Sequence, residues 1–110
     1  MTYAPERGDV VWTSFDPLRG HEQAGHRPAL VLSPRSYNVR RGLMICVPVT
    51  SRTKGYALEV PVECDGIRGV ALADQLNTLD WRARRVRFAG SQVSAAERAA
   101  RLIGALIGAS

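Results

Sequence analysis

Residues 20–34 read Gly20-His21-Glu22-Gln23-Ala24-Gly25-His26-Arg27-Pro28 and continue as Ala29-Leu30-Val31-Leu32-Ser33-Pro34. The first part is a glycine-bounded polar segment with a carboxylate, an amide, two imidazoles and a guanidinium. The apolar run that follows, closed by Ser33-Pro34, predicts a buried β-strand over residues 28–32. A loop of polar groups held still by a rigid strand is typical of a functional site.

Short apolar segments between Gly or Pro turns continue on both sides of this stretch. Residues 10–15 predict a strand that ends at the turn signal Asp16-Pro17, and residues 43–50 predict another, in which Pro48 indicates a sheet edge or a bulge. Further strands are predicted at residues 56–62, 70–73 and 84–88, with a tight turn between Gly66 and Gly69. Many short strands favour a small barrel or sandwich, in a mainly β fold with some α-helix, over parallel units.

Two segments have helical signals. Residues 36–41 predict one short helical turn. Near the C-terminus, Ser94-Ala95-Ala96-Glu97 matches a capping box, in which serine and glutamate side chains bond the first free amides of a helix. Four apolar residues then share one helical face, and Gly108 predicts the helix end; they are Leu102, Ile103, Leu106 and Ile107. We expect this helix to cover the barrel, the alternative being that it binds a partner.

Length and composition indicate one domain over residues 1–110. With 110 residues, of which 45% are apolar, the chain can bury one hydrophobic core. No apolar run approaches the roughly 20 residues of a membrane span, and the N-terminus lacks a signal-peptide pattern, so we expect a cytoplasmic protein without a membrane partner. We expect Cys46 and Cys64 to be free thiols and to hold no zinc.

The chain is basic, with a formal net charge of +5, and 14 of its 15 basic residues are arginine. A basic domain suggests a polyanion or an acidic protein as partner, and arginine suits bidentate phosphate contacts. An arginine-rich genomic composition explains the charge equally well, so nucleic-acid binding does not follow from charge alone.

Arg27 and Thr50 are the main candidates for chemistry. Arg27 precedes Pro28, which biases its backbone to extended geometry at the entrance of a strand. Its five donors allow it to pair with Glu22 and still contact a phosphate. Thr50 ends an apolar strand and precedes Ser51-Arg52-Thr53-Lys54. Hydroxyls followed by cations at a strand end suit phosphate binding, although such a cluster is also typical of a solvated loop.

Other polar residues have two interpretations each. The histidines His21 and His26 flank Glu22 and either transfer protons or belong to the frame of the loop. Asp74-Gln75, with Asn77 close behind, either reads base edges of single-stranded RNA or makes a turn.

An arginine cluster follows Trp81. Alternation along the predicted strand puts Arg85 and Arg87 on one face and Arg84 on the other. Trp81, beside Arg82, is either a platform for base stacking or part of the core.

The sequence lacks the motifs that are typical of several enzyme classes. The chain has no His-Glu-x-x-His, Cys-x-x-Cys, phosphate-binding glycine loop or Gly-x-Ser-x-Gly motif. Its acidic residues are too scattered to suggest a two-metal site. We therefore expect neither a metal nor another cofactor.

The chain resembles the MazF family of toxin ribonucleases along nearly its whole length. The most specific match runs from Glu22 through Pro34. The other matching segments are Gly8-Asp9-Val10-Val11-Trp12, Phe15-Asp16-Pro17, Val47-Pro48-Val49-Thr50, Lys54-Gly55-Tyr56, Gly69-Val70-Ala71-Leu72-Ala73-Asp74-Gln75 and Trp81-Arg82-Ala83-Arg84.

This resemblance implies an SH3-like β-barrel of the plasmid-maintenance-toxin type with a C-terminal helix, assembled as a homodimer. It implies a ribosome-independent endoribonuclease that cuts single-stranded RNA, chiefly mRNA, at a short sequence. It also implies a MazE-like antitoxin whose acidic tail lies across the RNA site. The catalytic arginine and threonine of the family fall on Arg27 and Thr50, and Glu22 matches an acid important for activity.

The expected reaction is a metal-independent transesterification, in which the ribose 2′-hydroxyl attacks the adjacent phosphorus and leaves 2′,3′-cyclic phosphate and 5′-hydroxyl ends. Arg27 and Thr50 would stabilise the phosphate charge. Glu22 would orient Arg27 or accept the 2′ proton, with His26 as the second candidate base. The expected RNA contacts are Gln23, His26, Ser51, Arg52, Lys54, Gln75, Asn77, Arg82 and Arg84.

The competing interpretation is a non-catalytic protein of the same fold. It would either inhibit DNA gyrase, as the CcdB branch of this fold does, or only bind RNA. Fold alone cannot separate these functions. The joint presence of Arg27 and Thr50 favours the nuclease.

Overall fold

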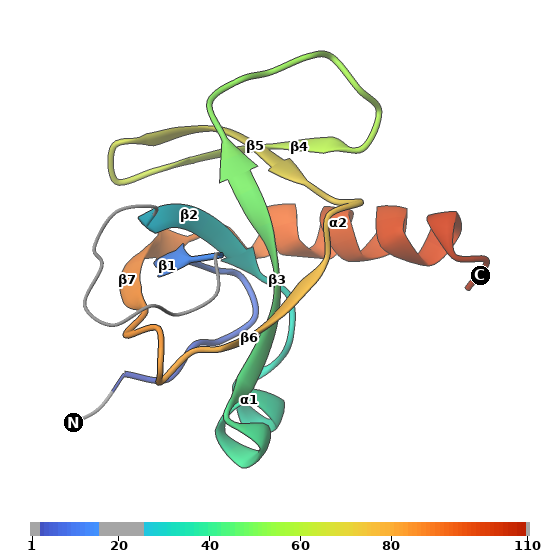
Figure 1. Cartoon of the computed structure of the whole chain (residues 1–110). Helices are drawn as coiled ribbons and strands as arrows, with labels where there is room; N and C mark the ends of the chain where they lie inside the picture. The colour runs from blue at the N-terminus through green and yellow to red at the C-terminus, as the bar shows by residue number, and fades with distance from the viewer. Residues whose placement is uncertain (1–2, 16–25, 110) are drawn as a thin grey trace.

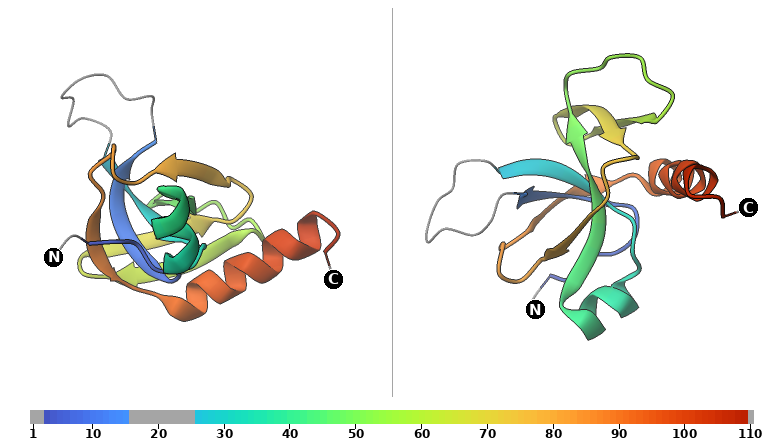
Figure 2. Two further views of the ribbon diagram at one scale, coloured as in Figure 1. Left: turned by 90° about the horizontal axis from the view of Figure 1, so that it is seen from below. Right: turned by 45° about the vertical axis from the view of Figure 1, so that its right-hand side comes forward.

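An antiparallel sheet with two helices makes up the part of the chain that the computed structural model describes, residues 3–15 and 26–109 (Figure 1). The sheet order is β4-β5-β3-β2-β1-β7, and β6 also pairs with β3. The elements are β1 (Asp9–Ser14), β2 (His26–Val31), α1 (Arg35–Arg41), β3 (Leu43–Thr50), β4 (Glu59–Cys64), β5 (Ile67–Leu72), β6 (Asn77–Asp80), β7 (Arg87–Ser91) and α2 (Val93–Leu106). The sheet curls into a half-barrel, and the expected mainly β fold with a C-terminal helix is confirmed (Figure 2).

β3 is the strand on which the others are assembled. It runs from α1 to the β4–β5 hairpin (Figure 1). On one side it pairs with β2, from Ala29↔Pro48 to Val31↔Cys46. On its other side, β6 pairs with its first half and β5 with its end at Val49 and Thr50. β3 therefore changes partner along its length.

The prediction that Pro48 marks a sheet edge is wrong, because β3 lies inside the sheet. Ile45 faces β2, since its carbonyl accepts from the Leu32 amide at 2.8 Å. Backbone polar groups alternate sides along a strand, so Pro48, three residues on, faces the side shared by β6 and β5. Pro48 lies between the registers of those two partners, where a missing N–H disrupts no pair among the described strands.

Apolar residues are buried on both faces of β1, β2 and β3. On one face, Val10, Leu30 and Val47 belong to a cluster that includes Val60 and three alanines of α2. On the other face, Val11, Ala29, Val31 and Cys46 pack with Met44, Leu79 and Trp81. Burial on two faces explains why residues 29–32 are continuously apolar instead of alternating. Trp81 is core filling, as one of its two interpretations held, and its indole nitrogen donates to the Asn38 carbonyl.

Helix α2 covers the sheet with its first half. Ala95, Ala96 and Ala99 are buried, whereas Leu106 and Ile107 are 56% and 74% exposed, and the helix projects past the sheet in Figure 2. The expected covering role is confirmed for these first turns. The helix ends as predicted, with Gly108 at φ +87°.

The predicted capping box is wrong. The N-cap is Gln92, two residues before Ser94, and no side chain caps the helix. The Gln92 amide donates to the Gly8 carbonyl at 2.6 Å, which ties the start of α2 to the start of β1. This tertiary contact sets where the helix begins, and Ser94 and Glu97 are left exposed on it.

Two strand predictions are also corrected. Residues 81–85 form a turn in which Arg85 has φ +50°, so the predicted strand over 84–88 and its alternating faces do not form, and β7 begins at Arg87. The turn of the β4–β5 hairpin is Asp65-Gly66, both with positive φ. Gly69 lies inside β5 and does not bracket the turn. Strand β6 was not predicted.

Both cysteines are free, as expected. Burial raises the pKa of the Cys46 thiol to about 12, so it is protonated at neutral pH. Neither described helix is long and apolar enough to cross a bilayer.

Gly69 allows β5 to approach the end of β3 closely. A Cβ atom at this position would lie 2.1 Å from the carbonyl oxygen of Thr50 and 3.2 Å from the Ser51 Cα. Backbone atoms cannot move away as a flexible side chain can. Any side chain at position 69 therefore separates β5 from Thr50.

We predict that Gly69→Ala lowers the free energy of unfolding by about 3 kcal/mol or more, because the added methyl group overlaps backbone. Gly55→Ala is the control: Gly55 has φ +82° but nothing lies within 4 Å of its would-be Cβ. The control should lose about 1–2 kcal/mol from backbone strain alone. Urea unfolding followed by circular dichroism measures both, and an equal loss in the two variants would contradict the role assigned to Gly69.

Candidate functional site

The sheet register brings Arg27 and Thr50 together. Ala29 pairs with Pro48, and continuing this antiparallel register toward the end of β3 sets Arg27 opposite Thr50. Both residues line the same cavity. The two groups singled out from the sequence, one guanidinium and one alcohol, thus line the same cavity at one end of the sheet.

This cavity, called the groove below, has a volume of about 770 Å³. The end of β1, the start of β2, the end of β3 and the β4–β5 hairpin contribute to it. Its described lining residues include three arginines and no carboxylate. They are Trp12, Phe15, Arg27, Pro28, Pro48, Val49, Thr50, Ser51, Arg52, Gly66, Ile67, Arg68, Leu72, Gln75 and Asn77.

The charge and shape of the groove suit an anionic chain with flat apolar parts. Arg27, Arg52 and Arg68 come from three separate elements, so positive charge surrounds the groove instead of lying along one strand. Guanidinium groups bind phosphate bidentately. The indole of Trp12 and the ring of Phe15 add aromatic surface at the same place.

The Thr50 hydroxyl is oriented and still able to donate. Its Oγ1 accepts a hydrogen bond from the Arg52 amide at 3.1 Å. The hydroxyl hydrogen is not used in this bond, because the amide is the donor. Thr50 can therefore donate that hydrogen to an anion in the groove.

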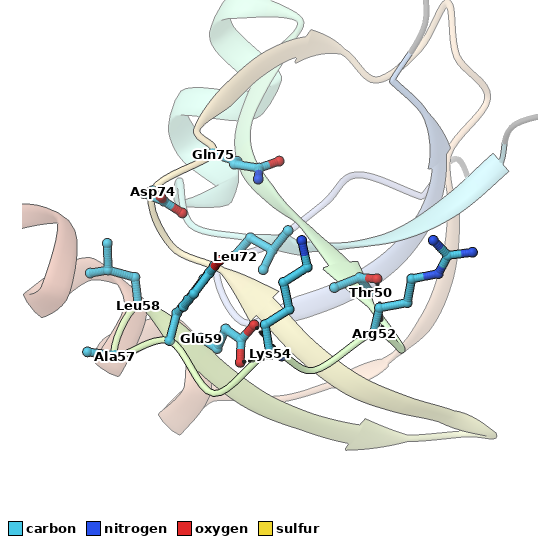
Figure 3. A pocket seen from close by; sticks show the side chains of 10 residues that line it. Thr50, Arg52, Lys54, Ala57, Leu58, Glu59, Leu72, Asp74 and Gln75 are labelled. Carbon is cyan, nitrogen blue, oxygen red and sulfur yellow. Dashed lines mark hydrogen bonds between the residues drawn. The ribbon is translucent and has the colours of Figure 1, made fainter.

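A second cavity, called the side pocket below, adjoins the groove and has a volume of about 400 Å³ (Figure 3). The two cavities share Thr50, Arg52, Leu72 and Gln75. The other residues that line the side pocket are Lys54, Tyr56, Ala57, Leu58, Glu59 and Asp74.

Glu59 holds the segment that forms one wall of the side pocket. Glu59 is 9% exposed as a residue, and its carboxylate accepts hydrogen bonds from the backbone amides of Lys54, at 3.0 Å, and Gly55, at 2.9 Å. Figure 3 shows this carboxylate beside the chain segment that carries Lys54. The buried charge is thus compensated by amides, and residues 51–58, called the anchored loop below, are fixed at their middle.

The structure brings together some of the site residues that the sequence predicts. Ser51, Arg52, Gln75 and Asn77 line the groove with Arg27 and Thr50, and Lys54 lines the side pocket. Glu22, Gln23 and His21 lie outside the described residues. His26 begins β2, next to Arg27, and is partly buried.

Arg82 and Arg84 line neither cavity. The Arg82 guanidinium stacks on the Trp81 ring, 4.7 Å from its centroid. The Nε of Arg84 donates to the Ser14 carbonyl at 2.9 Å, near the end of β1. Their role in RNA binding stays a prediction.

Some lining residues were not predicted. Trp12 and Phe15 belong to a segment that looked like an ordinary strand, and Arg68 follows a turn with no local signal for a site. Arg68 forms an exposed ion pair with Glu63 at 3.3 Å. Tyr56 belongs to a segment that resembles the family, but the sequence predicts it at the start of a strand and not in a cavity wall. Within residues 3–15 and 26–109, no three His, Cys, Asp or Glu side chains gather as a metal site.

Known proteins resemble this chain in sequence and structure. Residues 6–103 match the family described as PemK-like, MazF-like toxin of type II toxin-antitoxin system. The endoribonuclease toxin MazF of Escherichia coli K12 is 54% identical over 82 residues, which cover 74% of each chain. The endoribonuclease PemK of Escherichia coli is 44% identical over 86 residues, which cover 72% of this chain and 63% of that protein.

Two crystal structures from Deinococcus radiodurans have the same fold. The MazF structure superposes with a TM-score of 0.84 at 47% identity, covering 97% of this chain and 99% of the other. A chain of the MazE-MazF structure superposes with a TM-score of 0.84 at 42% identity, covering 99% of this chain and 100% of the other.

We predict that Glu59→Ala speeds hydrogen exchange of the Lys54 and Gly55 amides about tenfold or more, because each loses a charged acceptor. Glu59→Gln should restore part of the protection, since one amide oxygen still accepts. Exchange measured by NMR tests this, with Glu97→Ala, on an exposed turn of α2, as the control. Unchanged exchange in Glu59→Ala would show that the carboxylate does not anchor the loop.

Proposed function

The chain belongs to the PemK-like, MazF-like toxin family of type II toxin-antitoxin systems, and from that premise we propose that it is an endoribonuclease that cuts single-stranded RNA at a short sequence. The observation that carries the proposal is the meeting of Arg27 and Thr50 in one cationic groove. The similar proteins are named endoribonucleases, which favours the nuclease over a protein that only binds RNA.

The proposed reaction is a transesterification within the RNA strand. The ribose 2′-oxygen forms a bond to the adjacent phosphorus, and the bond from phosphorus to the 5′-oxygen breaks. The 2′ proton leaves to a base, and the departing 5′-oxygen gains a proton. The products are a 2′,3′-cyclic phosphate and a 5′-hydroxyl end.

The protein stabilises the extra negative charge that develops on the phosphate. Arg27 neutralises the non-bridging oxygens, and Thr50 donates its hydroxyl hydrogen to one of them. A guanidinium holds its proton tightly and is a poor proton donor, so the role of Arg27 is electrostatic. Glu22 is the first candidate for the base that takes the 2′ proton or for the group that orients Arg27, and His26 is the second.

Partners follow from the same premise. We propose a MazE-like antitoxin, since the Deinococcus radiodurans MazF fold was solved together with MazE. An acidic antitoxin tail suits the groove because its described lining has three arginines and no carboxylate. We also propose that the chain works as a homodimer, in the cytoplasm, where its RNA substrate is found.

We predict that Arg27→Ala lowers the rate of RNA cleavage by about 10²–10³-fold or more, because a donor to the developing charge is lost. Thr50→Val should lower it by a similar factor. Arg27 is exposed, so the fold should persist, as circular dichroism would show. Arg101→Ala, on α2, is the control that removes one positive charge elsewhere. Full activity in Arg27→Ala would remove Arg27 from the catalytic role.

The second prediction concerns the chemistry of the cut. Cleavage of a long transcript should continue in excess EDTA and give 5′-hydroxyl ends, and a single 2′-deoxy substitution at the cut should abolish it because the nucleophile is missing. End mapping by ligation, with and without prior 5′-phosphorylation, measures this. Intact RNA together with inhibited DNA supercoiling would instead favour a gyrase inhibitor.

A further inference from the structure

The excess positive charge of the chain lies in two segments outside the groove. Residues 35–42 and 76–85 together carry six arginines and one carboxylate, that of Asp80, whereas the remaining residues hold equal numbers of positive and negative charges. These two segments therefore account for the whole formal net charge of +5. Charge concentrated in this way attracts a polyanion more strongly than the same charge spread evenly.

The structure places these two segments side by side. Trp81 donates its indole hydrogen to a backbone carbonyl of α1 at 2.9 Å. The Arg82 guanidinium lies over the Trp81 ring, and its Nη1 atom is 4.0 Å from the position that a Cβ on Gly42 would take. Arg40 and Arg41 stand just before this glycine, in the last turn of α1. The end of α1 and the turn after β6 thus form one cationic surface.

Four exposed arginines of this surface, called the far arginine surface below, are available to a ligand; they are Arg40, Arg41, Arg82 and Arg85. The arginine ion pairs within residues 3–15 and 26–109 belong to Arg35 and Arg68 instead. The nearby Asp80 carboxylate accepts a hydrogen bond from the Ala83 amide at 2.9 Å. Stacking on Trp81 already holds Arg82 in place, which lowers the entropy that Arg82 loses when an anion binds.

Arg85 carries its charge on a strained backbone. Its φ is +50°, in the left-handed region that glycine adopts freely and other residues adopt at a cost. Its amide closes the turn by donating to the Arg82 carbonyl at 3.1 Å, and a glycine amide would close it equally well. The fold of the turn therefore does not need an arginine here, and strain of this kind points to a function of the side chain.

The far arginine surface and the groove lie at opposite ends of β3. Figure 1 shows α1 at one end of this strand and the β4–β5 hairpin at the other. β3 has eight residues, from Leu43 to Thr50. At about 3.4 Å per residue, its ends are about 24 Å apart. A stacked strand, with about 3.4 Å per nucleotide, covers this distance in about seven nucleotides. An RNA that is cut in the groove therefore needs flanking nucleotides to reach the far arginine surface.

We propose that the far arginine surface is a second RNA contact site, which binds backbone phosphates of the strand that flanks the cut. This inference rests on the proposed ribonuclease function. Guanidinium groups bind phosphate without reading the base, so the surface holds flanking RNA of any sequence. A long transcript supplies such phosphates beside every cut, whereas a short RNA that only fills the groove does not.

The first experiment compares two RNAs that carry the same mapped cut sequence. The short RNA ends about three nucleotides from the cut on each side, and the long RNA has about 15 further unstructured nucleotides on each side. For the wild-type protein, kcat/KM should be about tenfold higher on the long RNA. The double variant Arg40→Gln/Arg41→Gln should lose most of this advantage and still cut the short RNA at the wild-type rate. Glutamine keeps the helix propensity of arginine, and circular dichroism checks the fold.

The matched control is the double variant Arg98→Gln/Arg101→Gln. It removes the same charge from exposed positions of α2 and should keep the advantage of the long RNA. Arg85→Gly separates binding from folding. Because glycine relieves the left-handed strain, the unfolding temperature should stay the same or rise, whereas the advantage of the long RNA should fall about threefold. A merely structural role of Arg85 would lower the unfolding temperature and the cutting of both RNAs alike.

The second experiment measures binding without cleavage, on fluorescein-labelled short and long RNAs with one 2′-deoxy nucleotide at the cut. Each phosphate contact to a single strand adds about −0.7 to the slope of log K against log salt concentration. Three contacts at the far arginine surface should make the slope for the long RNA steeper by about 2. Arg40→Gln/Arg41→Gln should remove about 1.4 of this difference. A duplex DNA of equal length tests the other polyanion: tighter binding of that duplex, lost in the same variant, would overturn the assignment to RNA.

The outcomes separate this inference from the proposed function. RNA cutting by the wild-type protein with equal kcat/KM on the two RNAs would overturn the second contact site and leave the ribonuclease standing. An equal loss on both RNAs in Arg40→Gln/Arg41→Gln would do the same. An absence of RNA cutting by the wild-type protein would overturn both. A loss confined to the long RNA, seen in this variant and not in the α2 control, would support the inference.

Discussion

The site depends on a backbone contact between two strands. Gly69 of β5 lies so close to the Thr50 carbonyl that a Cβ atom would not fit, and β2 holds the other side of β3 in register. The end of β3 is therefore held from both sides. In the proposed reaction the Thr50 hydroxyl donates to the phosphate, and such a rigid support would hold it in place for that contact. The rest of the groove is built outward from this strand end.

Different parts of the fold supply different parts of the candidate site. In the proposed reaction, β2 and β3 present the groups that act on the phosphate, and the cations of the hairpin and the anchored loop attract the RNA backbone. The side pocket, beside the same threonine, has aromatic, apolar and polar side chains in its walls. Arginine contacts to phosphate position a strand without reading its sequence, whereas contacts to base edges select it. The residues that would act on the phosphate, the cations that would attract the RNA backbone and the walls of the side pocket thus lie next to one another. They are only partly the same residues.

The sequence predicts local structure where one element decides it, and fails where distant contacts do. Residues 43–50 matched β3 at both ends, because a long apolar run between Gly42 and a polar cluster has few alternatives. The start of α2 was misplaced because the bond from Gln92 to Gly8 overrides the local capping pattern. The strand predicted at 84–88 failed because alternation alone does not reveal that Arg85 adopts a left-handed backbone.

The candidate site, like the fold, was predicted where the local sequence decides the structure and missed where distant contacts do. Arg27 and Thr50 were identified because each ends or begins a clear strand, and several of the polar neighbours of Thr50 follow it in sequence. Trp12 and Arg68 were missed because they reach the groove through pairing between β1 and β2 and through the β4–β5 hairpin, which no local pattern reveals. The pocket wall at Tyr56 depends on the buried carboxylate of Glu59, three residues away, whose partners are backbone amides.

That carboxylate bears on how such a protein diverges over generations. The Glu59 carboxylate accepts hydrogen bonds from main-chain amides of the anchored loop. This contact therefore does not depend on which side chains the loop carries. Exchanges at positions such as 54 or 56 reshape the cavity wall while the strand end keeps its place. Single substitutions in the loop can therefore alter the wall of the side pocket while the backbone that carries it keeps its anchor.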